Sequence, residues 1–99
     1  MKNAVAHRAT AEQNAIRTAA QRPIAMKCLS EAVRAPAWRT KPSWYLLAED
    51  DRMFSPKTQR FVADRMGAQV RSHDVDHTPQ ISEPTVVIDF VLEAAGALL

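Results

Sequence analysis

Two carboxylates and a histidine follow two separate apolar segments in the second half of this 99-residue chain. Asp50 and Asp51 come directly after one apolar run, and His77 lies a short loop beyond a second, weaker one. A carboxylate that faces a histidine fixes the imidazole tautomer and stabilises the imidazolium, as in a Ser-His-Asp relay. The spacing therefore allows an acid–histidine pair, although spacing alone favours the plainer interpretation of ordinary polar residues at strand ends.

Two strands and the segment between them must position these side chains. Residues 43–48 form a short unbroken apolar run, which is typical of a strand buried on both faces. Residues 68–71 indicate a second, shorter strand, and a helix between the two makes the unit parallel with a right-handed crossover. Since both strands then end at one sheet edge, the residues beyond them line the crevice where open α/β sheets bind ligands.

The helix between the strands has a clear start and a clear stop. Ser55 is predicted to be its N-cap and Pro56 its first residue. Gly67 stands where the chain needs a left-handed residue to leave the helix. The apolar face of this helix is expected to carry Phe61, Val62 and Met66.

A last helix is predicted to begin after Ser82, which we expect to be its N-cap, with Pro84 in the first turn. One apolar stripe of this helix should face the sheet. The stripe consists of Val87, Phe90, Val91, Ala94 and Leu98.

The first forty residues predict helices and no strand. Residues 9–20 favour a helix, which Thr10 and Gln13 can cap as a capping box. Pro23 breaks this helix and opens a second short one, in which Cys28 is expected to be a buried apolar residue.

An extended linker over residues 35–42 then leads into the first strand. We therefore predict two parts, a helical segment with its linker over residues 1–41 and a βαβα part over residues 42–99. His7 is expected to lie in a frayed terminus without a role.

Composition narrows the class of protein. At 46% hydrophobic residues the chain is able to form a core, and its net charge of +2 comes from basic residues interspersed with acids. This pattern favours an ordinary solvated surface over a nucleic-acid interface. The single cysteine excludes an intrachain disulfide, and neither a signal peptide nor a membrane-spanning run is recognisable. We expect a soluble, cytoplasmic protein with neither a nucleic-acid nor a membrane partner.

Potential metal ligands are concentrated between His73 and His77, where Asp74 and Asp76 separate the two histidines. Asp and His suit zinc or manganese. However, the following Thr78-Pro79 predicts a loop, in which the spacing of the histidines has no special value. We therefore predict no metal site and no cofactor.

Several segments together resemble a known family. Residues 42–53 combine an apolar strand with an acid-bearing loop, and residues 59–68 add a helix and a turn. Asp76-His77 precede Ile-Ser-Glu-Pro at residues 81–84, while Gln-Arg-Pro at 21–23 and Ala-Trp-Arg-Thr at 37–40 lie upstream. From about Thr10 to the C-terminus, this order is similar to the cap end, acid strand and histidine loop of α/β-hydrolase-fold proteins, most of all small bacterial esterase-like members.

The resemblance implies a partial α/β-hydrolase fold, in the order helix, helix, strand, helix, strand, helix. It places the relay acid at Asp51, with Asp50 as the close alternative, and the relay histidine at His77. Relatives have Gly or Ser where this chain has Asp76, and we expect that carboxylate to compete for the proton of His77. The activity implied by the family is ester-type hydrolysis.

The family's nucleophile is a serine on a G-x-S-x-G turn, and this chain has only Gly67 and Gly96. We therefore expect a hydrolase-like fragment that is inactive alone and is completed by a complementing hydrolase segment. The alternative is a non-catalytic interaction module that self-associates, or binds a partner, through exposed apolar helices and open strand edges.

Overall fold

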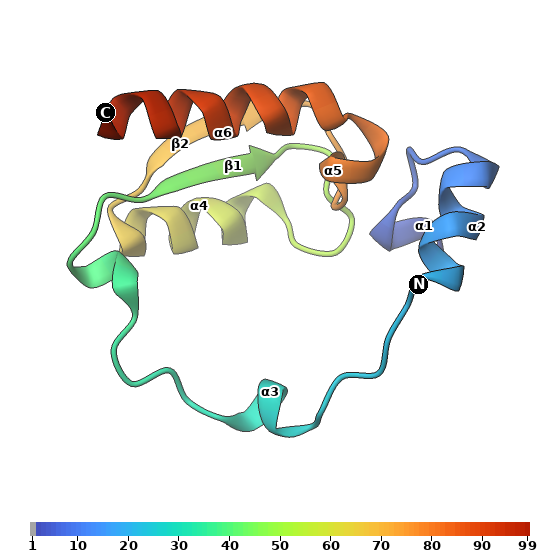
Figure 1. The fold of residues 1–99 in the computed structure, drawn as a ribbon, viewed down its shortest axis with the longest axis horizontal. Helices are drawn as coiled ribbons and strands as arrows, with labels where there is room; N and C mark the ends of the chain where they lie inside the picture. The colour runs from blue at the N-terminus through green and yellow to red at the C-terminus, as the bar shows by residue number, and fades with distance from the viewer. Residues whose placement is uncertain (1) are drawn as a thin grey trace.

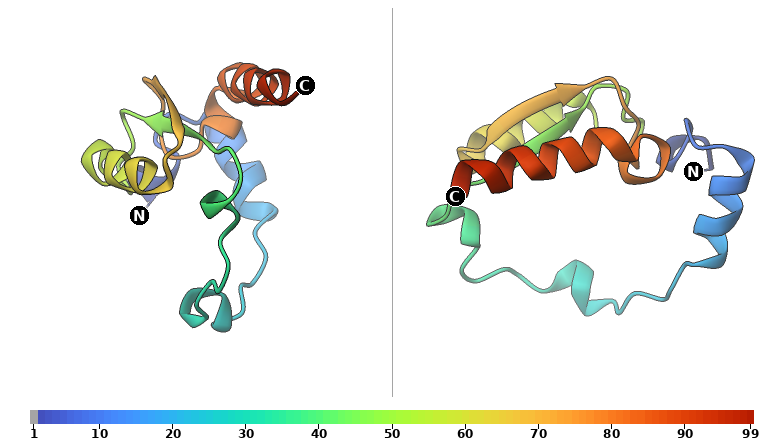
Figure 2. Two further views of the ribbon diagram at one scale, coloured as in Figure 1. Left: turned by 90° about the vertical axis from the view of Figure 1, so that its left-hand side faces the viewer. Right: turned by 45° about the horizontal axis from the view of Figure 1, so that its top comes forward.

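The computed structural model describes residues 2–99 and contains a two-stranded parallel sheet. Strand β1 (Trp44–Ala48) pairs with β2 (Gln69–His73), in a register that sets Trp44 opposite Gln69 and Ala48 opposite His73. Helix α4 (Pro56–Met66) connects the strands and covers one face of the sheet, while α6 (Pro84–Leu98) lies across the other (Figures 1 and 2). The predicted parallel strand–helix–strand unit is confirmed.

The remaining elements are short. As predicted, no strand occurs among the first forty described residues, and the chain between α2 (Ala11–Ala19) and β1 arcs away from the sheet (Figure 1). Two single-turn helices, α1 (Lys2–Val5) and α5 (Pro79–Ser82), were not predicted. The other short elements are α2, α3 (Lys27–Ser30) and the 3-10 helix η1 (Ala37–Arg39).

Three of the predicted helix-capping signals are confirmed. The Ser55 hydroxyl accepts a hydrogen bond from the backbone N–H of Thr58 at 3.2 Å. Gly67 ends α4 with φ 63°, the left-handed conformation that favours glycine. Thr10 and Gln13 form both halves of the capping box at the start of α2.

The predicted N-cap role of Ser82 is wrong. Pro79 opens α5, and this extra helical turn ends at Ser82, so Glu83 precedes α6 instead. The hydroxyl of Ser82 donates to the Asp76 carboxylate at 2.8 Å.

Two expectations about burial are also wrong. In α4 the buried residues are Gln59 and Ala63, whereas Phe61 is 69% exposed, because the helical period places Phe61 nearly opposite both of them, on the side that faces away from β1. Cys28 is exposed because the arc that carries α3 packs against no core. The buried apolar residues are Ala6, Leu47, Ala48, Ala63 and Val75.

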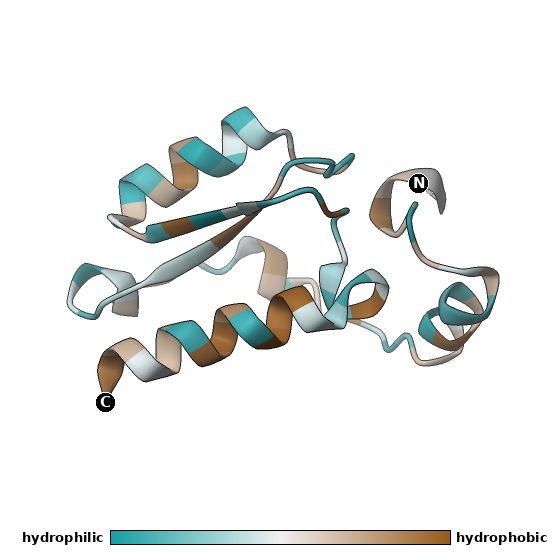
Figure 3. Ribbon diagram, turned by 90° about the horizontal axis from the view of Figure 1, so that it is seen from above, coloured by the Kyte–Doolittle hydropathy of each residue, from teal (hydrophilic) through white to brown (hydrophobic). Residues whose placement is uncertain are grey.

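The stripe predicted on α6 is buried only in part. Phe90 is half-buried, but Val91 and Leu98 are 55% and 62% exposed. Apolar residues run along the whole helix (Figure 3). Within residues 2–99, no helix combines the length and apolarity needed to cross a membrane.

The accessible surface area of the chain is larger than that of a compact monomer of the same mass. Its accessible surface is 7544 Å² for 11.0 kDa, whereas a folded monomer of that mass exposes about 5,600 Å². Its radius of gyration of 15.0 Å also exceeds the value of about 13 Å expected for a compact domain of this length. The fold therefore exposes more surface than a compact domain does, and large apolar side chains such as Phe61 and Leu92 are part of that surface.

One buried side chain joins α4 to the end of β1. The Oε1 atom of Gln59 accepts from the backbone N–H of Ala48 at 2.9 Å, and its Nε2 donates to the carbonyls of Ala48 at 3.0 Å and Phe54 at 2.9 Å. Buried backbone groups that lack a partner are costly. Gln59 thus acts in place of a neighbouring strand at this point.

We expect Gln59→Leu, which keeps the side-chain volume, to lower the free energy of unfolding by about 2 kcal/mol, because it leaves these backbone groups unpaired. Gln69→Leu, at an exposed position of β2, is the matched control and should change it by about 0.5 kcal/mol or less. Chemical denaturation measures both values. Equal losses in the two variants would contradict the bracing role of Gln59.

Candidate acid–histidine site

The two loops that carry the predicted site residues remain paired beyond the ends of the strands. The backbone N–H of Glu49 donates to the carbonyl of His73 at 2.9 Å, and that of Asp50 donates to the carbonyl of Val75 at 3.1 Å. Val75 is itself fully buried. This continued pairing brings the residue after Asp50 next to the segment that ends in His77.

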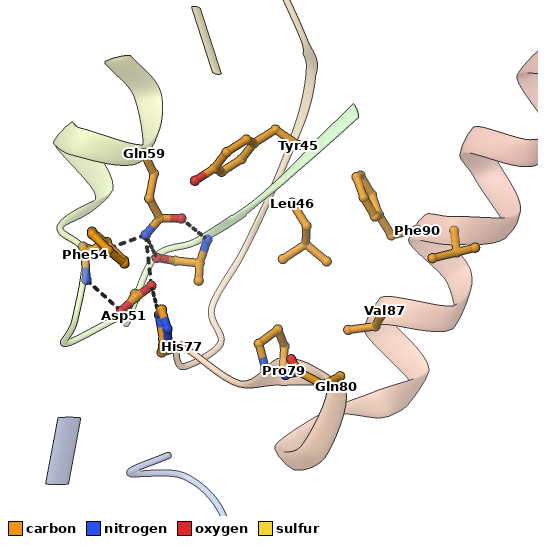
Figure 4. A pocket seen from close by; sticks show the side chains of 12 residues that line it. Tyr45, Leu46, Asp51, Phe54, Gln59, His77, Pro79, Gln80, Val87 and Phe90 are labelled. Carbon is orange, nitrogen blue, oxygen red and sulfur yellow. Dashed lines mark hydrogen bonds and ion pairs between the residues drawn. The ribbon is translucent and has the colours of Figure 1, made fainter. Parts of the chain in front are cut away.

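Asp51 and His77 are in direct contact (Figure 4). The Nδ1 atom of His77 lies 2.8 Å from Oδ2 of Asp51. The Asp51 side chain is only 6% exposed, whereas that of His77 is 30% exposed. Of the two candidate acids, the structure therefore places Asp51 against the histidine.

The other oxygen of Asp51 is held by the backbone. Its Oδ1 accepts from the N–H groups of Met53 at 2.7 Å and Phe54 at 2.9 Å. The amide of Gln59 approaches Oδ2 at 3.5 Å. Hydrogen bonds from both sides fix the carboxylate in the orientation that meets the imidazole.

The contact determines what His77 is able to do. With its Nδ1 proton donated to Asp51, the ring keeps the lone pair of Nε2 for accepting a proton from another group. The ring of Phe54 lies 5.7 Å away between centroids, at an interplanar angle of 39°. An oriented general base requires this geometry.

An apolar groove extends from the pair between β1 and α6 (Figure 4). Its volume is about 530 Å³. Burial, and then the nearby charge of Asp51, raise the pKa of Tyr45 at its wall. Its other lining side chains include Leu46, Phe54, Val87, Phe90 and Val91.

Asp50 faces away from His77 and binds the N-terminal segment. His7 Nε2 lies 2.8 Å from its Oδ2, and Arg8 Nε donates to the same oxygen at 2.8 Å. The hydrogen bond from His7, followed by that from Arg8, lowers the pKa of Asp50. The expectation of a frayed and idle His7 is therefore wrong, since its side chain is only 7% exposed. No sequence pattern indicated this contact, which joins segments far apart in the chain.

Asp76 does not compete for His77, contrary to expectation. Its carboxylate is fully buried and accepts from the N–H of Thr78 at 3.0 Å, the hydroxyl of Ser82 at 2.8 Å and the N–H of Arg8 at 3.0 Å. Burial alone would raise the pKa of Asp76, but these hydrogen bonds outweigh it and lower the pKa. The residue fixes the histidine loop from within.

The dense His and Asp residues of this loop do not converge. Among residues 2–99, no three His, Cys, Asp or Glu side chains are grouped as a metal site would require. His73 closes β2 opposite Ala48, while His77 lies against Asp51.

The lowered pKa of Asp50 predicts a pH dependence of stability. Contacts that lower the folded-state pKa stabilise the protein fully above the unfolded pKa of about 3.9, and this stabilisation is lost as the pH falls through the lower folded-state pKa. Asp50→Asn should thus be less stable than the parent chain at pH 7, and the difference should shrink as the pH falls below about 4. Urea denaturation at a series of pH values measures it, and a difference that stays constant down to pH 3 would contradict the prediction.

Comparison with known proteins agrees with the fold. The sequence model of the alpha/beta hydrolase family matches residues 2–90, which include the strands, both loops and the N-terminal segment that binds them. No curated protein and no solved structure gives a significant match. The two-strand parallel sheet and its helices fit part of the α/β-hydrolase fold. The chain therefore belongs to the α/β hydrolase family.

Proposed function

We propose that this chain supplies the acid and the histidine of a Ser-His-Asp relay for ester-type hydrolysis. The observation that supports the proposal is the 2.8 Å contact between His77 Nδ1 and a nearly buried Asp51 carboxylate. A surface ion pair would not need the two backbone donors that hold the far oxygen of Asp51. Such fixation is the requirement for orienting a general base.

In the proposed reaction, Nε2 of His77 takes the proton from a serine hydroxyl as the serine oxygen attacks the ester carbonyl carbon. The same proton then passes to the departing alkoxide, so the alcohol leaves and an acyl-serine remains. Water repeats the cycle, giving its proton to His77, and the proton returns to serine as the acid is released. Asp51 keeps the imidazole oriented and stabilises its charge throughout.

The serine and the oxyanion donors must come from another segment. Gly67 is the C-cap of α4 and Gly96 lies within α6, so neither forms a G-x-S-x-G turn. We propose that a complementing hydrolase segment pairs with the sheet and covers its apolar surroundings. The excess surface of roughly 1,900 Å² over a compact monomer exceeds the about 800 Å² that each partner buries in an interface of standard size.

A chimera tests the relay directly. Residues 42–99 replace the corresponding C-terminal part of an α/β-hydrolase-family esterase that keeps its own G-x-S-x-G serine. We expect turnover of p-nitrophenyl acetate, with kcat/KM lowered about 10²–10⁴-fold by His77→Ala and by a similar factor in Asp51→Asn.

His73→Gln is the matched control for the chimera, because His73 lies in the same segment but outside the pair. It should leave kcat/KM close to that of the parent chimera. The 99-residue chain alone should hydrolyse the ester no faster than its own His77→Ala variant. Equal effects of the two histidine variants in folded chimeras would refute the relay role.

Self-association is the second candidate function, and exposed apolar side chains on α6 favour it. Ile88 and Leu92 are 56% and 64% exposed. Within the described residues, the sheet has two strands, and each keeps one unpaired edge. An interaction module built on these surfaces would form one discrete oligomer of this chain.

Size-exclusion chromatography with light scattering separates the two proposals. The relay proposal predicts a mixture whose mean mass changes with concentration, because the open edges lack their cognate partner. The self-association proposal predicts one mass, a fixed multiple of 11.0 kDa, over a tenfold range of concentration. A single stable oligomer would therefore favour the interaction module.

A further inference from the structure

We propose that His7 and Arg8, here called the N-terminal clamp, are positioning residues for the Asp51–His77 pair. The clamp holds the acid loop and the histidine loop at the same time. The inference rests on the proposed relay for its catalytic meaning, but it concerns geometry that is measurable without any turnover.

The clamp grips the acid loop through Asp50. His7 Nε2 and Arg8 Nε both approach Oδ2 of Asp50, each at 2.8 Å. Asp50 is bonded directly to the residue that orients His77. A shift of the Asp50 backbone would therefore be transmitted to Asp51.

The clamp grips the histidine loop through two acids. The backbone N–H of Arg8 donates to Oδ2 of Asp76 at 3.0 Å. The guanidinium donates to Asp74 twice, to its carbonyl at 2.5 Å and to its Oδ1 at 2.6 Å. Since Asp76 directly precedes His77 in the chain, these contacts restrain the backbone that leads into His77.

The burial of the residues in contact indicates which contacts contribute most to stability. Asp74 is 81% exposed, and an exposed ion pair contributes little. The His7 side chain is 7% exposed, Asp76 is fully buried and Ala6 is 1% exposed, so this part of the contact is packed, whereas the Asp50 side chain is 37% exposed. Charge-assisted hydrogen bonds in such surroundings are the stronger class.

The surroundings of the second ring nitrogen of His7 favour a donor role for the first. Its Nδ1 is buried and has no hydrogen-bond partner among the described residues. A proton on Nδ1 would be buried without an acceptor, so the geometry suits the tautomer that carries its proton on Nε2. That tautomer donates to Asp50.

The rival explanation is that the clamp merely anchors the N-terminal segment and leaves the pair unaffected. NMR of the full chain labelled with ¹⁵N-histidine distinguishes the two. In the unmodified chain, the His77 Nδ1 proton should give a downfield resonance that Asp51→Asn abolishes. In the His7→Ala, Arg8→Gln double variant, we expect that proton to exchange with water about tenfold faster or to be lost.

Three further variants keep the test decisive. Arg17→Gln is the matched control in the same N-terminal segment, because Arg17 binds Asn14 rather than either loop, and it should leave the resonance unchanged. If the double variant fails to fold, Arg8→Gln and Arg8→Lys replace it, since both keep the backbone donor to Asp76. The lysine should restore part of the protection that the glutamine loses.

Protection of the His77 proton equal to that in the unmodified chain, in a folded clamp variant, would overturn the inference and leave the relay proposal intact. The same result for Arg8→Gln and Arg8→Lys would overturn it if the double variant does not fold. Absence of the hydrogen-bonded Nδ1 signal from the unmodified chain would overturn both proposals.

Discussion

The parallel pairing of β1 with β2 is the constraint on which the rest of the structure depends. Its hydrogen bonds continue past the strand ends, from Glu49 to His73 and from Asp50 to Val75. Because of this extension, the acid loop and the histidine loop leave the sheet side by side. Gln59 then satisfies the last backbone groups of β1, and Asp76 satisfies those of the histidine loop. Each buried polar side chain of the site completes hydrogen bonding that two strands alone leave unfinished.

Neighbouring carboxylates in these loops have separate tasks. Asp50 and Asp51 are adjacent, yet one faces the N-terminal segment and the other faces His77. Asp76 likewise turns inward while His77 turns toward the groove. Both pairs lie in loops beyond the strands, and a hydrogen-bonded turn at the first pair, in which the N–H of Asp51 donates to the carbonyl of Ala48 at 3.4 Å, directs its two side chains to different partners. The acids therefore brace the site on one side and complete it on the other.

The sequence allowed prediction of the parts that depend on short-range rules. Ser55, Gly67 and the Thr10–Gln13 box follow from local hydrogen bonding, and the meeting of Asp51 with His77 follows from parallel strands ending together. The burial of Gln59 in place of Phe61 depends on which face of α4 meets β1, which no local pattern encodes. The roles of His7 and Arg8 depend on a contact between distant segments without periodicity. Such contacts are invisible to a pattern that looks only a few residues along the chain.

The arc between α2 and β1 makes the N-terminal contact a ring closure. Arg8 and Asp50 are 42 residues apart, and closing a flexible loop of that length costs about 3 kcal/mol of chain entropy. The arc is exposed over most of its length, so little else restricts it. A partner that packed against the arc would order it and so reduce this entropy cost. Its binding would thereby stabilise the distant contact between Arg8 and Asp50 through chain entropy alone.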